Sequence, residues 1–154
     1  MAISAATLTT TVSESITLNG TTYGNTITKT HASVKVIRQQ AVVVPTSEVT
    51  LYNAAGDAAG ITFDEDNIKY VRITNTDTTN FIGVVLETTQ GDEFQYKVLA
   101  GCSLILNAHV LAMEATTAGA DVTPGTFSAN ADIVNITAIA DTAAVDVELF
   151  IAST

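Results

Sequence analysis

Residue types that commonly build catalytic and metal sites are scarce in this chain. Its 154 residues include no Trp, one Cys (Cys102) and two His (His31 and His109). One cysteine excludes a disulfide within the chain, and zinc needs about three or four Cys, His or carboxylate ligands. A Cys–His pair needs a thiolate in an electropositive environment, and the Gly-x-Ser-x-Gly nucleophile motif is absent. We therefore expect no enzyme activity, metal or cofactor, and we expect Cys102 to be a small buried apolar residue beside a strand.

Positive charge is also scarce. Six Lys and Arg residues stand against sixteen Asp and Glu residues, which gives a formal net charge of −10 and an isoelectric point near 4.2. Nucleic acids and anionic membranes are bound through basic surfaces, so we expect neither as a partner. No apolar run approaches the roughly 18 residues of a membrane-spanning helix. The first residues lack the basic and apolar parts of a signal peptide, and we expect none.

One acidic run, Asp64-Glu65-Asp66, is a candidate cation site. Together with Asn67 it offers the oxygen ligands that calcium takes, although the spacing does not match an EF-hand loop. Consecutive acidic residues also commonly face water with no ligand. The sequence leaves both interpretations open.

Much of the chain shows the alternation of apolar and polar residues that is typical of β-strands. Residues 68–107, around which the rest is organised, predict four strands separated by three tight polar turns. In residues 93–99, for example, Phe94, Tyr96 and Val98 alternate with polar residues. Successive side chains of a strand point to opposite faces, so this alternation predicts a sheet with one buried side.

Short polar sequences predict where the strands turn. Residues 75–80 read Asn-Thr-Asp-Thr-Thr-Asn, and Asn and Asp side chains can bond to nearby backbone in a turn. Residues 90–92 and 100–101 each contain a Gly that breaks the strand pattern. Asn19-Gly20 is the strongest short hairpin signal, because both central residues of a type I′ turn need a positive φ.

The other strands are predicted from shorter apolar runs. They are expected at residues 15–18, 21–30, 34–44, 48–53, 110–115, 133–139 and 144–151, with long connections at 54–66 and 116–131. The alternation shifts at residues 37–40, which predicts a β-bulge or a division into two strands. Residues 3–12 are interpreted either as a weak strand or mobile arm that packs on a neighbouring subunit, or as a frayed terminus or edge strand.

About ten strands at a spacing of roughly 8–12 residues, with no convincing amphipathic helix, predict an all-β fold. We expect an antiparallel β-sandwich with about 8–10 strands, formed by residues 31–154 as a single domain. Residues 1–30 are expected to be an N-terminal arm and hairpin. Periodicity does not encode the order in which strands pair, so a jelly roll and an immunoglobulin-like sandwich both remain open.

A resemblance to a known group of proteins narrows this choice. Its order of elements is a strand, an Asn-Thr-Asp turn, a strand, a Leu-x-Ala/Pro-Gly turn and a strand. The residues that carry it are Tyr70-Val71-Arg72-Ile73-Thr74-Asn75-Thr76-Asp77, Asn80-Phe81-Ile82, Phe94-x-Tyr96-Lys97-Val98-Leu99-Ala100-Gly101 and Ser103-Leu104-Ile105-Leu106. In this order the chain resembles small virion proteins of tailed bacteriophages, which have a jelly-roll β-sandwich.

The resemblance implies a capsid decoration, or cement, protein. Such a protein would be made in the host cytoplasm and would bind the major capsid protein on the outer surface of the phage head, where it would stabilise the shell. It would self-associate as a homotrimer. Residues 3–12 or residues 54–67 are the segments that we expect to contact the shell or a neighbouring subunit.

Two other classes of function remain open, besides a neck or tail protein of the virion. One is a carbohydrate-binding or adhesin-type β-sandwich. The absence of Trp counts against sugar stacking, although Tyr23, Tyr52 and Tyr70 remain available. The other is a cupin-type enzyme, which would need a cluster of metal-binding histidines that His31 and His109 are too few to form.

Overall fold

The computed structural model describes residues 4–54, 63–107, 112–113 and 132–154. Strands make up most of this part of the chain, together with one short 3-10 turn, η1 (Glu65–Asn67). The strands are β1 (Ala6–Ser13), β2 (Ile16–Leu18), β3 (Thr21–Tyr23), β4 (Thr26–Val34), β5 (Val36–Val44), β6 (Val49–Asn53), β7 (Ile68–Asn75), β8 (Ile82–Thr88), β9 (Glu93–Val98), β10 (Ser103–Leu106), β11 (Ile133–Ala140) and β12 (Val145–Ser153).

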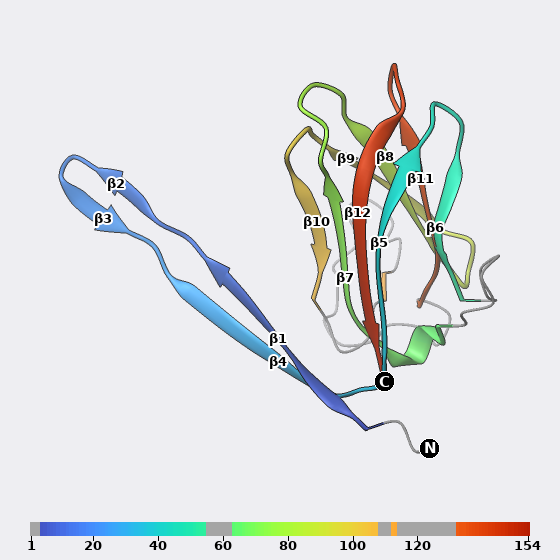
Figure 1. Ribbon diagram of the computed structural model, residues 1–154, viewed down its shortest axis with the longest axis horizontal. Helices are drawn as coiled ribbons and strands as arrows, with labels where there is room; N and C mark the ends of the chain where they lie inside the picture. Colours follow the sequence, from blue (N-terminus) through green and yellow to red (C-terminus); the bar gives the residue numbers. More distant parts are fainter. Residues whose placement is uncertain (1–3, 55–62, 108–111, 114–131) are drawn as a thin grey trace, which may run out of the picture.

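The strands from β5 to β12 form a sandwich of two antiparallel four-stranded sheets (Figure 1). One sheet has the order β10-β7-β12-β5, and the other has the order β6-β11-β8-β9. The strands pair as nested hairpins: β8 with β9, β7 with β10, β6 with β11 and β5 with β12. Nested hairpins rolled into two sheets form a jelly roll. The predicted all-β sandwich is confirmed, and the pairing order decides its topology.

The core lies between the two sheets and is built by alternate side chains of each strand. On β12, Val145, Val147, Leu149 and Ile151 are at most 1% exposed, whereas Asp146 between them is exposed. The predicted closing strand is therefore confirmed, with these four apolar side chains on one face. The other buried members of the core are Val44, Leu51, Tyr52, Phe63, Ile68, Val71, Ile73, Ile82, Val84, Leu86, Val98, Ile133, Ile136, Ala138 and Ala140.

The four strands predicted in the middle of the chain are confirmed as β7 to β10. The turn between β7 and β8 is held by side chains, as its sequence predicts. Asn75, which is fully buried, donates through Nδ2 to the carbonyl oxygens of Asn80 (2.9 Å) and Val98 (3.2 Å). Asp77 Oδ1 accepts hydrogen bonds from the backbone N–H groups of Asn80 (2.8 Å) and Thr79 (2.6 Å). These two bonds lower the pKa of the Asp77 carboxyl.

The predicted irregularity at residues 37–40 is wrong. β5 pairs with β12 along its whole length without a register shift, and the chain breaks instead at Lys35, after Ser33 with a φ of +63°. The alternation is obscured because Arg38 and Gln40 pair with core residues of β12, on the inward-facing side of β5. Both are half-buried. On the edge strand of a sheet, such long side chains can carry their polar ends to solvent.

The first four strands form an arm that projects from the sandwich (Figure 1). β1 pairs with β4, and β2 pairs with β3 nearer the tip. The predicted hairpin is confirmed, since Asn19 and Gly20 have φ values of +50° and +79°, as a type I′ turn requires. The strand predicted at residues 21–30 is divided near Gly24, where a Cβ atom would lie 1.9 Å from the carbonyl oxygen of Glu14. Glycine is required at this close approach.

Some predictions fall outside the described residues. Of the strand predicted at residues 110–115, the structure describes residues 112 and 113, and Ala112 forms an isolated bridge with Asp132. The long connection at 116–131 lies outside the description, as do residues 55–62 of the first long connection.

Candidate functional site

The residues considered for catalysis lie apart. Cys102 is exposed in the turn between β9 and β10, so the prediction that its thiol is buried is wrong. The turn bends at Gly101, with a φ of +71°, and leaves Cys102 outside the sheet. His31 is buried and contacts Asn107, just beyond the other end of β10. Five residues of extended chain span about 17 Å, which is too far for a catalytic pair. His109 lies outside the described residues.

The acidic run has a structural role at the start of η1. Asp64 Oδ1 accepts a hydrogen bond from the backbone N–H of Asp66 at 3.1 Å and so caps this short turn. Within the described ranges, no group of three or more His, Cys, Asp and Glu side chains is placed to hold a metal ion. In the same ranges, no helix is long and apolar enough to cross a bilayer.

Two of the three tyrosines considered for sugar stacking are buried. Tyr52 is 1% exposed and donates to the carbonyl oxygen of Phe63 at 3.2 Å. Burial, followed by the negative charge of the nearby Glu65, raises the pKa of the Tyr52 phenol above its ordinary value. Tyr70 is 8% exposed beneath the base of the arm. Of the three, Tyr23 alone presents its ring to solvent, near the tip of the arm.

The arm consists of two ladders, β2-β3 and β1-β4, separated by residues 14–15 and 24–25. The register is the same on both sides of this interruption and sorts the side chains into two faces. Each step away from the turn advances one residue on both strands. Residues that pair directly have side chains on the same face, and the next pair points to the opposite face. From tip to base, the pairs are Leu18–Thr21, Thr17–Thr22, Ile16–Tyr23, Ser13–Thr26, Val12–Ile27, Thr11–Thr28, Thr10–Lys29, Thr9–Thr30 and Leu8–His31.

One face of the arm, which we call the hydroxyl face, consists of Thr and Ser side chains. Several of their oxygens lie close enough to bond across the two strands: Ser13 and Thr26 at 3.0 Å, Thr17 and Thr22 at 3.1 Å, and Thr11 and Thr28 at 3.4 Å. The face as a whole comprises Thr9, Thr11, Ser13, Thr17, Thr22, Thr26, Thr28 and Thr30. Such groups are satisfied by one another and by water.

The opposite face also holds the polar residues Thr10, Glu14, Thr21, Asn25 and Lys29, because the same alternation places them there. We call it the apolar face for the five large apolar side chains that it carries, which are Val12, Ile16, Leu18, Tyr23 and Ile27. Their exposed fractions are 45, 62, 58, 56 and 63%, respectively. Large contiguous apolar patches are uncommon on monomeric proteins and mark interaction surfaces. A two-stranded hairpin is also only marginally stable in water by itself. Both arguments identify the apolar face as the candidate functional site.

The base of the arm is fixed to the outer face of the β10-β7-β12-β5 sheet. Leu8 and Val34 of the arm pack with Tyr70, Phe150 and Ala152 of the sandwich in a small second cluster. The rings of Tyr70 and Phe150 meet edge to face, with centroids 5.8 Å apart. The arm is therefore joined to the sandwich by apolar packing as well as by the chain itself.

A polar contact beside this cluster ties both strands of the arm to the sandwich. Asn107 Nδ2 donates to Thr10 Oγ1 on β1 at 3.2 Å, while Asn107 Oδ1 lies 2.6 Å from Nε2 of His31 on β4. One side chain of the sandwich thus holds both strands where the arm leaves the sheet.

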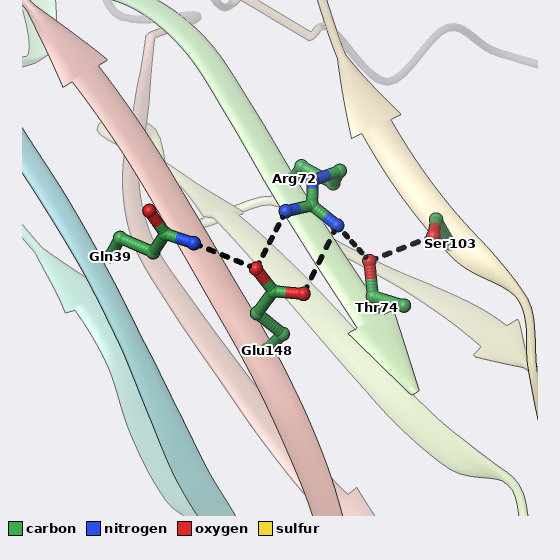
Figure 2. Close-up of polar contacts among 5 residues, drawn as sticks. All are labelled: Gln39, Arg72, Thr74, Ser103 and Glu148. Carbon is green, nitrogen blue, oxygen red and sulfur yellow. Dashed lines mark hydrogen bonds and ion pairs between the residues drawn. The ribbon is translucent and has the colours of Figure 1, made fainter. Parts of the chain in front are cut away.

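A row of polar side chains crosses the outer face of the same sheet (Figure 2). Arg72 Nη2 and Gln39 Nε2 donate to Glu148 Oε1 at 2.9 and 3.0 Å, and Arg72 Nη1 donates to Thr74 Oγ1 at 2.8 Å. The hydroxyl groups of Thr74 and Ser103 lie 2.8 Å apart. The hydrogen bonds from Arg72 and Gln39 lower the pKa of Glu148. These residues come from all four strands, so the row joins the sheet on its solvent side.

Charge is distributed unevenly between the arm and the sandwich. Glu14 and Lys29 are the only Asp, Glu, Lys or Arg residues in positions 1–34. The arm is therefore neutral overall, and the formal net charge of −10 belongs to residues 35–154.

Comparison with family models, with curated proteins and with solved structures finds no match. The case for function therefore depends on the geometry of this chain and on the resemblance of its central strands.

Sequence reasoning missed the apolar face, although it identified the Asn19-Gly20 turn and named Tyr23 as a candidate binding residue. It did not pair residues 3–12 with the strand that follows the turn. Counting outward from the turn would have supplied the signal, because a two-residue turn sets the register of the whole hairpin.

Proposed function

We propose that this chain is a structural protein of a virion, a capsid decoration subunit that binds the outer surface of a bacteriophage head. Its partner would be the major capsid protein. The observation that carries the proposal is the arm, which holds an uncovered apolar face away from an acidic sandwich. An extension of this kind is suited to assembly. The resemblance of residues 68–107 to small virion proteins of tailed bacteriophages supports the same conclusion.

Such a subunit stabilises a shell by mass action. A protein that binds the assembled shell but not its free subunits lowers the free energy of the assembled state. At a free concentration one hundred times its dissociation constant, each occupied site gains about 2.7 kcal/mol. Repetition over many sites multiplies the effect, and this role requires no catalytic residue. The acidic sandwich would favour a basic area on the shell.

The subunit is proposed to act as a homotrimer, as the resemblance implies. A second candidate, glycan binding, has less support because Tyr52 and Tyr70 are buried. The exposed Tyr23 is a single ring and lies among aliphatic side chains of the apolar face.

The test is binding to shells assembled from the major capsid protein of the same virus. Purified chain is added to shells, and bound copies are counted after sedimentation while the melting temperature of the shell is recorded. We expect saturable binding and a higher shell melting temperature. A chain lacking residues 2–12, which removes most of β1, is expected to bind less while its sandwich stays folded. Shells that remain bare at saturating concentration would contradict the proposal.

A further inference from the structure

We propose that the apolar face of the arm docks on the same face of the arm in another copy of this chain. The inference deepens the proposed function, on which it rests for the need to self-associate, by naming a surface through which subunits meet. Parallel arms can surround a three-fold axis, whereas antiparallel arms form pairs. The face already has one covered end: Leu8 and His31, at the base, lie against the sandwich of their own chain. Beyond Thr10 the same face continues outward with its apolar side chains exposed.

Charge favours contact between arms over contact between sandwiches. Two sandwiches that each carry the net charge of −10 repel one another, whereas the arms are neutral. From Thr9 to Leu18 the arm extends about 33 Å, at roughly 3.3 Å for each residue. This is several times the Debye length of about 8 Å at physiological ionic strength. Arms can therefore meet along their outer parts while the charged sandwiches stay apart.

The spacing of side chains along the face suits a partner with the same face. We call each directly paired set of two residues on this face a level. Val12 and Ile27 form one apolar level, and Ile16 and Tyr23 form another. Between them lies one polar level, where the backbone N–H of Glu14 donates to the carbonyl oxygen of Asn25. The apolar levels are symmetric about this polar level. Two such faces therefore place these two apolar levels on apolar levels whether the arms run parallel or antiparallel. Antiparallel arms centred on Glu14 would also place Leu18 on Thr10 and Glu14 on Glu14, so the pattern favours parallel arms.

The size of the face predicts a reversible association. A ribbon about 33 Å long with two strands about 4.8 Å apart presents a face on the order of 300 Å² in projection. Stable interfaces usually bury about 800 Å² on each partner. Contact between arms alone should therefore depend on concentration, which makes it measurable by sedimentation over a dilution series.

The first part of the test compares two neighbouring residues on opposite faces. Ile16→Lys places a charge on the apolar face, and Thr17→Lys places the same charge on the hydroxyl face. The full-length wild-type chain should self-associate as its concentration rises. Ile16→Lys should weaken this association by at least about 30-fold, whereas Thr17→Lys should leave it close to that of wild type. A wild-type chain that is monomeric at every concentration, or equal losses in both variants, would overturn the proposal.

The second part asks whether the partner surface is another arm. Ile16→Lys chains are mixed in equal amounts with Ile16→Glu chains, or with Val12→Glu chains. Parallel arms bring position 16 to the level of position 16 in the partner, across the axis between the two arms, so the first mixture should recover association. Antiparallel arms centred on Glu14 bring position 16 to position 12, so the second mixture should recover it. Recovery in neither mixture would mean that the face docks elsewhere, and the proposal would fail.

These outcomes are separable from those of the proposed function. Association is measured without shells, and the melting temperature of the sandwich verifies that each variant is folded. A wild-type chain that self-associates through its arms but leaves shells bare would contradict the decoration role alone. A monomeric chain that nevertheless coats shells would contradict the arm contact alone.

Discussion

The arm and the sandwich have the same alternation of apolar and polar side chains, but their apolar side chains differ in burial. On β12 of the sandwich, Leu149 and Ile151 are fully buried. On the arm, Ile16 and Ile27 keep more than 60% of their surface exposed. The difference lies in what faces each strand, because a second sheet covers β12 and no described part of the chain covers the outer arm. Burial therefore depends on the number of layers and not on the pattern of a strand alone.

This comparison also explains where each region obtains its stability. Burying a large apolar side chain contributes about 1.5–3 kcal/mol relative to leaving it exposed. The sandwich gains this contribution at each of its buried apolar positions. The arm gains stabilisation from apolar burial at its base, where Leu8 and Val34 pack against Tyr70 and Phe150. Its outer part gains mainly backbone hydrogen bonds and contacts between hydroxyl groups. The outer arm should therefore depend on a partner for its full stability.

The largest expected difference in the free energy of unfolding comes from truncating one apolar side chain to Ala in each region. Leu149→Ala removes a fully buried side chain between the two sheets, and it should lower the free energy of unfolding by about 2–5 kcal/mol. Ile27→Ala on the arm should change it by less than about 0.5 kcal/mol at concentrations where the chain is monomeric. Urea unfolding measures both. A similar loss of unfolding free energy for the two variants would contradict the stated difference in stability between the sandwich and the outer arm.

The next effect contrasts two asparagines in tight turns. Asn75→Ala removes donors to the carbonyl oxygens of Asn80 and Val98 inside the sandwich. Leaving such buried groups unpaired should cost about 1–3 kcal/mol of unfolding free energy. Asn19→Ala, at the exposed tip of the arm, should leave the unfolding of the sandwich unchanged. If Asn19→Ala proved the more harmful of the two in denaturant titrations, the arm would be part of the cooperative fold.

A smaller effect is expected at the joint between the two regions. Asn107→Ala removes the contacts to both Thr10 and His31. The base of the arm should then open more readily by about 1 kcal/mol, seen as faster hydrogen exchange of amides in β1 and β4. Amides of β12 serve as the control and should exchange at the wild-type rate. Faster exchange throughout the sandwich would show that Asn107 supports more than the joint.

The smallest effect concerns acidification of the turn at Asp77. Its folded pKa lies below the ordinary value of 3.8 because the N–H groups of Asn80 and Thr79 bond to the carboxylate. The charged form therefore stabilises the fold above that value, and the contribution is lost as the pH falls through the folded pKa. Asp77→Asn should be less stable than wild type at neutral pH and should approach it in acid. A difference that does not change with pH would contradict this account.

Local signals in the sequence predicted much of the fold. The polar turn at residues 75–80 and the Asn19-Gly20 hairpin were predicted because side-chain hydrogen bonds and positive φ values are properties of a few neighbouring residues. The strand boundaries from β7 to β10 followed from the same kind of information. At residues 37–40 the local pattern was misleading, because Arg38 and Gln40 occupy inward-facing positions at a sheet edge and hide the alternation.

The candidate site was predictable in part. The Asn19-Gly20 turn was identified, and Tyr23 was named as a candidate binding residue. The common face of Val12, Tyr23 and Ile27 follows from counting outward from that turn. The sequence could not predict whether another part of the chain covers this face, because coverage depends on how distant segments pack. For the same reason Tyr70 was open to a binding role, although Leu8 and Val34 bury it.

The sequence by itself determined most of the strands, most of their turns and the net negative charge, because each depends on residues that are neighbours along the chain or on a simple sum of charge. The tertiary structure alone decided the nested pairing of β5 to β12 and the projection of the arm. It also decided which alternating faces are buried. These features depend on contacts between residues far apart in the chain, and a period of two residues is the same for a covered face and an uncovered one.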